Sequence, residues 1–177
     1  MMARSHGLGR GVGMLIGILV AGLVSACSSS GTLTITQPKT QSIPPGHTVS
    51  LAVELDVAEP LAVHQEVVTR IRERLFGRLV SDRIFKAVVH APDPADYRMD
   101  VKIRGAREVS TGARIMLGAM IGPNTTSVVV AVRHQATDQV ITAFEATGTS
   151  AAVPLSSEAG LDDAVREAVG KIIEGLR

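Results

Sequence analysis

The clearest pattern in the chain is a strict alternation of apolar and polar residues between positions 48 and 57. Val49, Leu51 and Val53 alternate with residues such as Ser50 and Glu54. Successive side chains of a strand point to opposite faces, so the pattern predicts a strand with one buried face. From Pro60 to Asp82 the period changes, because apolar residues recur every four positions at Val63, Val67, Ile71, Leu75 and Leu79. This spacing predicts a helix after the strand.

Further along, four segments at 84–90, 97–104, 127–135 and 140–149 predict strands, the last two joined by a turn at Thr137-Asp138. Residues 161–176 carry apolar positions at helical spacing and predict a second amphipathic helix. The expected order is β-α-β-β-β-β-α. We therefore expect an α/β (α+β) fold. It is a two-layer sandwich with a mixed, mostly antiparallel sheet of about five strands and two helices on one face.

The first 26 residues have the three parts of a secretion signal, with Arg4 and Arg10 ahead of an apolar run at 12–24 and small residues after it. The apolar run is shorter than the roughly 20 residues that a membrane span needs. Leu23 to Cys27 reads Leu-Val-Ser-Ala-Cys and resembles a bacterial lipobox. The resemblance implies cleavage before Cys27, a diacylglycerol on its sulfur and usually a third acyl chain, such as palmitate, on its amine. Residues 1–26 are thus predicted to be a lipoprotein signal peptide.

Cys27 is the only cysteine, so lipidation also explains a thiol that could form no disulfide. Residues 27–47 are rich in Ser, Thr, Gln and Pro. This composition predicts a lipidated N-terminus and a flexible tether, with a reach of about 25 Å. Residues 48–177 are predicted to form a single periplasmic domain. In Gram-negative lipoproteins an aspartate after the cysteine retains the protein at the inner membrane. Ser28 therefore predicts a lipid-anchored protein of the outer membrane that faces the periplasm.

The composition argues against several classes of function. The formal net charge is +1, which does not predict nucleic-acid binding, and one Tyr, three Phe and no Trp leave few rings for stacking on sugars or bases. The histidines are scattered, and neither a serine-nucleophile elbow nor a phosphate-binding loop is present, so we expect no enzyme activity, cofactor or metal. A hydrolase with a dispersed site would need a pocket that gathers His90, Asp93 and Asp96, or His134 and Asp138.

Two features are candidate contact sites. Arg70, Arg74 and Arg78 recur four apart on the first predicted helix, and such a basic face could bind lipid phosphates or an acidic partner. An ordinary solvated helix face, with Glu66 paired to Arg70, explains the same residues.

The second feature is the apolar, glycine-rich segment 112–122, which does not alternate. It could be an inserted loop, a mobile hairpin or a contact patch for a partner or lipid. The candidate contact residues are Ile115, Leu117, Gly118, Met120 and Gly122. A buried strand bent at its glycines is the alternative.

The chain resembles a family of uncharacterised proteobacterial lipoproteins, DUF4410, over roughly Val49 to Leu176. The resemblance depends on the run from Asp96 to Val101, on the glycine-rich link from Thr111 to Gly122, and on the hairpin that follows with Val128, Val130, Val132 and Asp138. It implies an envelope compartment and an α/β domain, and it brings no known activity or site residue.

The leading hypothesis is a non-catalytic envelope lipoprotein that binds a protein partner or assembles with itself. An open sheet edge or segment 112–122 would make the contact. The first alternative is an accessory lipoprotein subunit of a lipid or polymer export or secretion machine. The second is the dispersed-site hydrolase.

Overall fold

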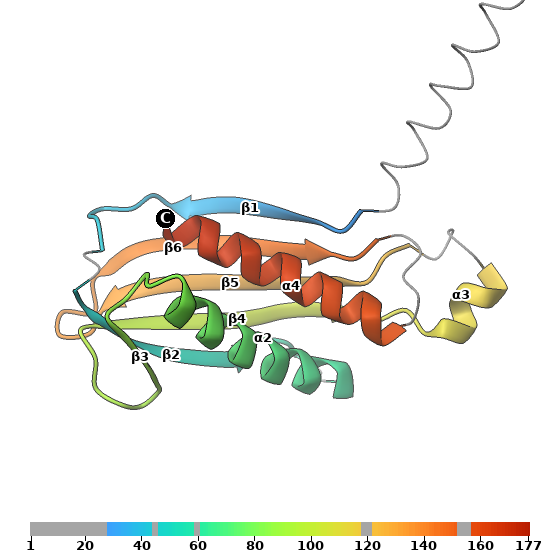
Figure 1. The fold of residues 1–177 in the computed structure, drawn as a ribbon, viewed down its shortest axis with the longest axis horizontal. Helices are drawn as coiled ribbons and strands as arrows, with labels where there is room; N and C mark the ends of the chain where they lie inside the picture. The colour runs from blue at the N-terminus through green and yellow to red at the C-terminus, as the bar shows by residue number, and fades with distance from the viewer. Residues whose placement is uncertain (1–27, 44–45, 59–60, 118–121, 152–156) are drawn as a thin grey trace, which may run out of the picture.

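The computed structural model describes residues 28–43, 46–58, 61–117, 122–151 and 157–177 (Figure 1). Its elements are β1 (Ser30–Gln37), β2 (Thr48–Leu55), α2 (Ala62–Ser81), β3 (Ala87–His90), β4 (Tyr97–Arg107), α3 (Thr111–Leu117), β5 (Thr125–His134), β6 (Val140–Thr149) and α4 (Ser157–Leu176). The predicted signal peptide and Cys27 lie outside the described residues.

The strands form one six-stranded sheet in the order β1-β6-β5-β4-β2-β3. The three pairings from β1 to β4 are antiparallel, whereas β2 runs parallel to both β4 and β3. A parallel pair needs a crossover connection, and α2 provides it between β2 and β3. The predicted mixed, mostly antiparallel sheet is confirmed, with six strands instead of about five.

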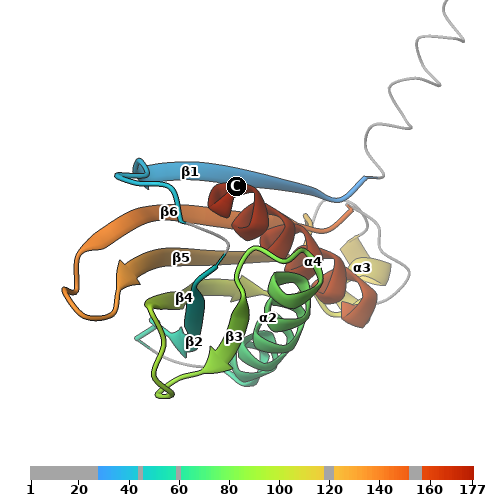
Figure 2. The same ribbon diagram turned by 60° about the vertical axis from the view of Figure 1, so that its left-hand side comes forward.

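Helices α2 and α4 cover the same face of this sheet, so the predicted two-layer arrangement is also confirmed (Figures 1 and 2). The core lies between the layers. Strand β4 contributes Tyr97, Met99, Val101 and Ile103, all at most 4% exposed, and its alternate residues point to the other face. The stripe predicted on the first helix is buried from Val67 to Leu79 and half-buried at Val63, and the inward positions of β5 and α4 are buried as well. None of the helices in the described part of the chain has both the length and the apolar character of a membrane span.

The sixth strand is β1, which lies inside the segment predicted to be a flexible tether. That prediction is wrong for residues 30–37, because they pair with β6 from Ser30 opposite Thr149 to Gln37 opposite Ala143. The physical reason is that Thr and Ile are β-branched and favour strands, although Thr counts as polar in a composition argument. The domain therefore begins before residue 48.

Two further expectations need correction. A third helix, α3, occupies the first half of the segment 112–122 and lies beyond one end of the sheet, outside the layer of α2 and α4 (Figure 1). Strand β2 was expected to bury one face, yet Ser50 and Ala52 on its other face are 3% and 8% exposed. Strand β2 lies between β3 and β4, and Ser50 is flanked by the larger side chains of its register partners Val89 and Arg98.

Helix α4 lies unusually close to the strands beneath it. A Cβ atom added to Gly148 of β6 would be 1.8 Å from the carbonyl oxygen of Ala164 and 2.4 Å from the amide nitrogen of Ala168. Near the other end of α4, Gly175 faces the ring of Phe144, which would lie 2.8 Å from an added Cβ. Glycine on the strand and glycine on the helix thus allow the two layers to approach.

The start of β2 is joined to the start of β4 by Asp96. Its carboxylate accepts hydrogen bonds from the Thr48 amide at 2.7 Å and from the Thr48 hydroxyl at 3.0 Å, and it lies 3.3 Å from His47 Nδ1. The hydrogen bonds from the Thr48 backbone and side chain hold the pKa of Asp96 below its ordinary value, because they favour the charged carboxylate.

We expect Gly148→Ala to lower the free energy of unfolding by about 3 kcal/mol, at the upper end of the usual cost of overpacking. The added methyl group would overlap backbone atoms of α4, which cannot rotate away. Denaturant unfolding of the purified protein measures the change.

Gly170→Ala is the matched control, since Gly170 is an exposed residue of the same helix and an added Cβ meets nothing within 4 Å. It should be neutral or stabilising by up to about 1 kcal/mol. Equal stability of the two variants would contradict the close packing at Gly148.

Candidate functional site

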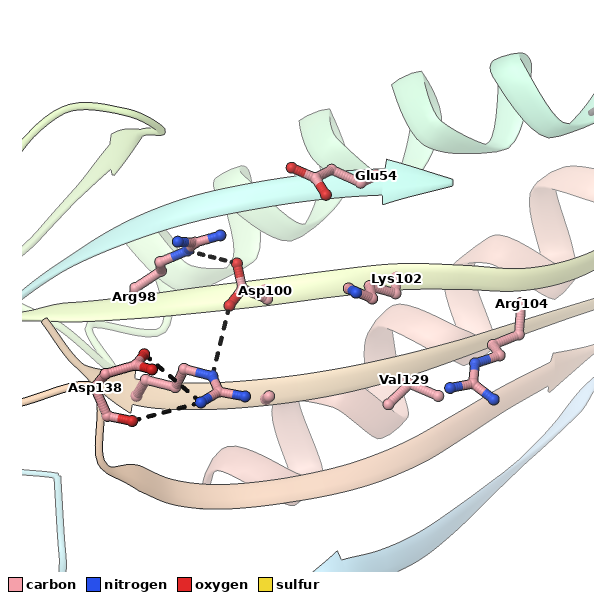
Figure 3. A pocket seen from close by; sticks show the side chains of 9 residues that line it. Glu54, Arg98, Asp100, Lys102, Arg104, Val129 and Asp138 are labelled. Atoms are coloured by element: carbon pink, nitrogen blue, oxygen red, sulfur yellow. Dashed lines mark hydrogen bonds and ion pairs between the residues drawn. The ribbon is translucent and has the colours of Figure 1, made fainter. Parts of the chain in front are cut away.

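The face of the sheet opposite the helices is uncovered and holds a shallow depression of about 510 Å³ (Figure 3). Side chains from β2, β4 and β5 and from the turn after β5 line it: Glu54, Arg98, Asp100, Lys102, Arg104, Val129, Ala131, Arg133 and Asp138. Every second residue of β4 points here, which is the polar half of the alternation seen in the sequence. Four cationic and three anionic side chains therefore share this face with small apolar ones.

Asp100 lies at the centre of the charges on this face. It accepts a hydrogen bond from Arg98 Nε at 2.7 Å, and Arg133 Nε lies 3.9 Å from its other oxygen (Figure 3). Arg133 in turn lies 3.6 Å from Asp138, on the turn between β5 and β6. Lys102 has no such ion pair among the described residues. The arrangement forms a mixed-charge surface that suits contact with another polar surface.

The residues that a dispersed hydrolase would use are not gathered in this depression, which is lined by Asp138 without His134. His90 stacks on Phe76 with ring centres 4.7 Å apart, and Asp96 binds Thr48. Within the described ranges, no three His, Cys, Asp or Glu side chains form a group that could hold a metal ion.

The arginine stripe of α2 is engaged within the molecule. Arg70 and Arg74 reach across to α4 and contact the Asp162 carboxylate, at 3.3 Å and 2.6 Å. Arg70 also pairs with Glu66, as its spacing predicts, and Arg78 pairs with Asp82 at 3.1 Å. The sequence shows no sign of the link to α4, because Asp162 is about ninety residues away along the chain.

In its described part, segment 112–122 is neither a buried strand nor a hairpin. Its first residues form α3, where Ile115, Met116 and Leu117 are 79%, 83% and 57% exposed. Gly118 and Met120 lie outside the described residues, and Gly122 has φ +79°, which suits glycine. Sequence reasoning identified the segment, although Met116 was not among its candidate residues.

Asn124 fixes the base from which α3 projects, a role that the sequence did not indicate. It is fully buried, and its side-chain oxygen accepts a hydrogen bond at 2.9 Å from the amide of Val109, which follows β4. Its backbone amide donates to the Ser150 hydroxyl at 3.0 Å, and its carbonyl accepts from the Ser150 amide. One residue thus ties together the chain after β4, before β5 and after β6.

The edge of the sheet formed by β1 is the other exposed feature. Its eight residues, Ser-Gly-Thr-Leu-Thr-Ile-Thr-Gln, contain no charged residue and no proline. One side of β1 pairs with β6, and no described strand pairs with the other side. Edge strands of monomeric proteins usually carry a charge, a proline or a bulge that prevents pairing with another chain. A small register irregularity between Ile35 and Gln37 lies near the C-terminal end of β1, and the rest of it is regular.

This geometry defines the class as a small α+β domain with two helices on one face of a mixed sheet and a charged, uncovered surface on the other. The chain belongs to the family DUF4410, a domain of unknown function, whose model matches residues 33–154. The match begins inside β1 and confirms the resemblance proposed from the sequence. None of the curated proteins matches the chain.

Solved structures of other proteins share the fold, among them PelC and a protein of family DUF330. PelC from Paraburkholderia phytofirmans, whose structure is a dodecamer, is 17% identical with a TM-score of 0.57, and the match covers 82% of this chain and 96% of that one. A protein of family DUF330 from Xanthomonas campestris is 11% identical with a TM-score of 0.52, covering 79% of this chain and 86% of that one.

We expect Asn124→Ala to destabilise the domain by about 1–3 kcal/mol, the usual cost of leaving a buried polar group unpaired. The Val109 amide, which is almost fully buried, would lose its acceptor. Denaturant unfolding measures the loss, and Gln135→Ala serves as the control because Gln135 is an exposed amide. If both variants were as stable as the parent, the hydrogen bonds of Asn124 would not hold these three chain segments together.

Proposed function

We propose that this chain is a non-catalytic lipoprotein of the bacterial envelope, anchored through Cys27 to the periplasmic side of the outer membrane, whose domain assembles with copies of itself along β1. The observation that carries the proposal is the open edge of β1, a regular and uncharged strand that begins three residues after Cys27.

The anchor is supported by the residues around Cys27. The Leu-Val-Ser-Ala-Cys motif ends on the only cysteine of the chain, after a basic and then an apolar stretch. Three residues reach at most about 10 Å, so a lipid on Cys27 would hold β1 close to the membrane surface. Because residues 30–37 pair with β6, the connection from Cys27 to the domain would be a few residues long instead of the predicted tether of about 25 Å.

Self-assembly is supported by the contrast between the two edges of the sheet. Strand β3 has four residues, too few for an extended pairing, whereas β1 has eight. Its threonines and isoleucine favour extended backbone, and its free backbone groups are a ready template for a further strand. The dodecameric state of PelC, which shares the fold, is consistent with assembly of this chain into homo-oligomers.

The mixed charges on the uncovered face support the same proposal. A surface with cations and anions side by side can meet a second polar surface without leaving one sign of charge unopposed. Lys102 and Glu54 lie at paired positions of β4 and β2 near the middle of this face. Neighbouring copies joined at β1 would present such faces in a continuous surface.

For the anchor, we expect cells that express the chain to incorporate labelled palmitate into it, and Cys27→Ala to abolish the label. The acyl chains need the Cys27 sulfur and the amine that cleavage exposes. Ser30→Ala should keep full labelling, since it leaves the Leu23–Cys27 motif intact. Labelling that persists in Cys27→Ala would refute the anchor.

For assembly, we expect the purified lipoprotein to be oligomeric in detergent and Thr34→Lys to convert it to a monomer. Thr34 is an exposed residue in the middle of β1, and a lysine there would have to lose water for a second strand to pair. Sedimentation velocity measures the state, with Thr69→Lys on the exposed side of α2 as the control that should stay oligomeric. A parent protein that is monomeric at every concentration would refute assembly.

A further inference from the structure

Helix α3 lies at the end of the sheet where β1 begins (Figures 1 and 2). The pairing register connects the two places: Ser30 lies opposite Thr149, Thr149 opposite Thr125, and Thr125 opposite Arg107, which α3 follows after three residues. Three strand spacings separate the ends of β1 and β4, about 14 Å across the sheet. Cys27 lies within about 10 Å of Ser30, because three residues reach no further.

The exposed part of α3 is an apolar tip. Ile115, Met116 and Leu117 are consecutive, so they point in three directions about 100° apart around the helix axis. All three are more than half exposed. A helix that docks in a protein groove needs apolar residues along one stripe, spaced three or four apart. Apolar residues on every side of a helix end suit a medium that surrounds it, and a lipid leaflet is such a medium.

The charge around the tip is suited to a phospholipid surface. Residues 109–124 contain no aspartate or glutamate and one basic residue, Arg114. An acidic residue close to the tip would be repelled by anionic headgroups and would resist transfer from water. Asn124 holds the base of the projection through hydrogen bonds to Val109 and Ser150, so the chain that leads into α3 is tied to the end of the sheet.

We propose that the tip of α3, formed by Ile115, Met116 and Leu117, inserts into the same phospholipid leaflet that holds the acyl chains of Cys27. The inference rests on the proposed anchor and goes beyond it. The acyl chains retain the protein at the membrane, and the tip fixes the orientation of the domain. The strand ends from which the two contacts extend lie about 14 Å apart across the sheet, so two separate contacts would hold the strands at a set angle to the leaflet.

The test uses the acylated protein in vesicles of phosphatidylethanolamine and phosphatidylglycerol. Acylation blocks the Cys27 sulfur, so Met116→Cys introduces a single free thiol that accepts an environment-sensitive fluorophore. We expect blue-shifted emission from this site and strong quenching when the vesicles contain lipids with spin-labelled acyl chains. Val80→Cys is the matched control. Val80 is an exposed apolar residue in the last turn of α2, two residues before Asp82, which pairs with the C-terminal Arg177. Its label should stay water-exposed and unquenched.

A second variant makes the result specific to the tip. Replacing Ile115 and Leu117 by serine in the Met116→Cys protein should reduce quenching severalfold, while the protein stays bound through its acyl chains. Mass spectrometry of the same sample reports acylation of Cys27 and so separates failure of the anchor from failure of the tip. An acylated protein with equal quenching at positions 116 and 80 overturns the insertion and leaves the anchor intact. Blue-shifted emission without quenching by lipid overturns it in favour of a protein contact, and an unacylated chain overturns both.

Discussion

Helix α4 can lie directly on β6 because residue 148 has no side chain. Both α2 and β1 are in turn bonded to α4. An added Cβ at Gly148 would meet the backbone of α4 at 1.8 Å, so the two elements are in contact along their main chains. From this position α4 presents Asp162 to the arginines of α2 and Glu167 to Ser29, at 2.8 Å, just before β1. The second helix and the first strand are thus both held against an element fixed by one glycine.

The helices cover one face of the sheet, and the opposite face has a different composition. The uncovered face carries Arg98, Asp100, Lys102 and Arg104 along β4, whereas the covered face of the same strand is entirely apolar or aromatic. The solvent-facing charges keep this face soluble without a third layer, and their ion pairs, such as Arg98 with Asp100, limit the net charge of the surface. The domain therefore exposes a broad polar face, an uncharged edge at β1 and an apolar tip at α3, which are three chemically different surfaces.

Sequence reasoning predicted the elements whose pattern repeats for several turns or several residues. The alternation of β4 and the four-residue spacing of α2 are such patterns, and both elements are present. Strand β1 was missed because Thr32 and Thr34 read as polar linker residues, although their shape favours extended backbone. Helix α3 is too short for a helical period to be visible. The bonds of Arg74 to Asp162 and of Asn124 to Val109 join residues that only the folded chain brings together. The apolar, glycine-rich composition of segment 112–122 marked it as a candidate contact site, but the sequence did not predict that its first half forms a helix.

The short connection between Cys27 and β1, which begins three residues later, has a consequence for how copies of the chain meet. If Cys27 carries acyl chains, this short connection would confine every copy to a thin layer beside the leaflet. Copies would then meet by lateral diffusion in two dimensions. The local concentration in that layer is far higher than the average through the compartment, and all the copies present the same end to the lipid. This higher effective concentration of β1 edges would favour strand pairing that is too weak to form in free solution. The membrane would then act as a template that aligns the subunits before they touch.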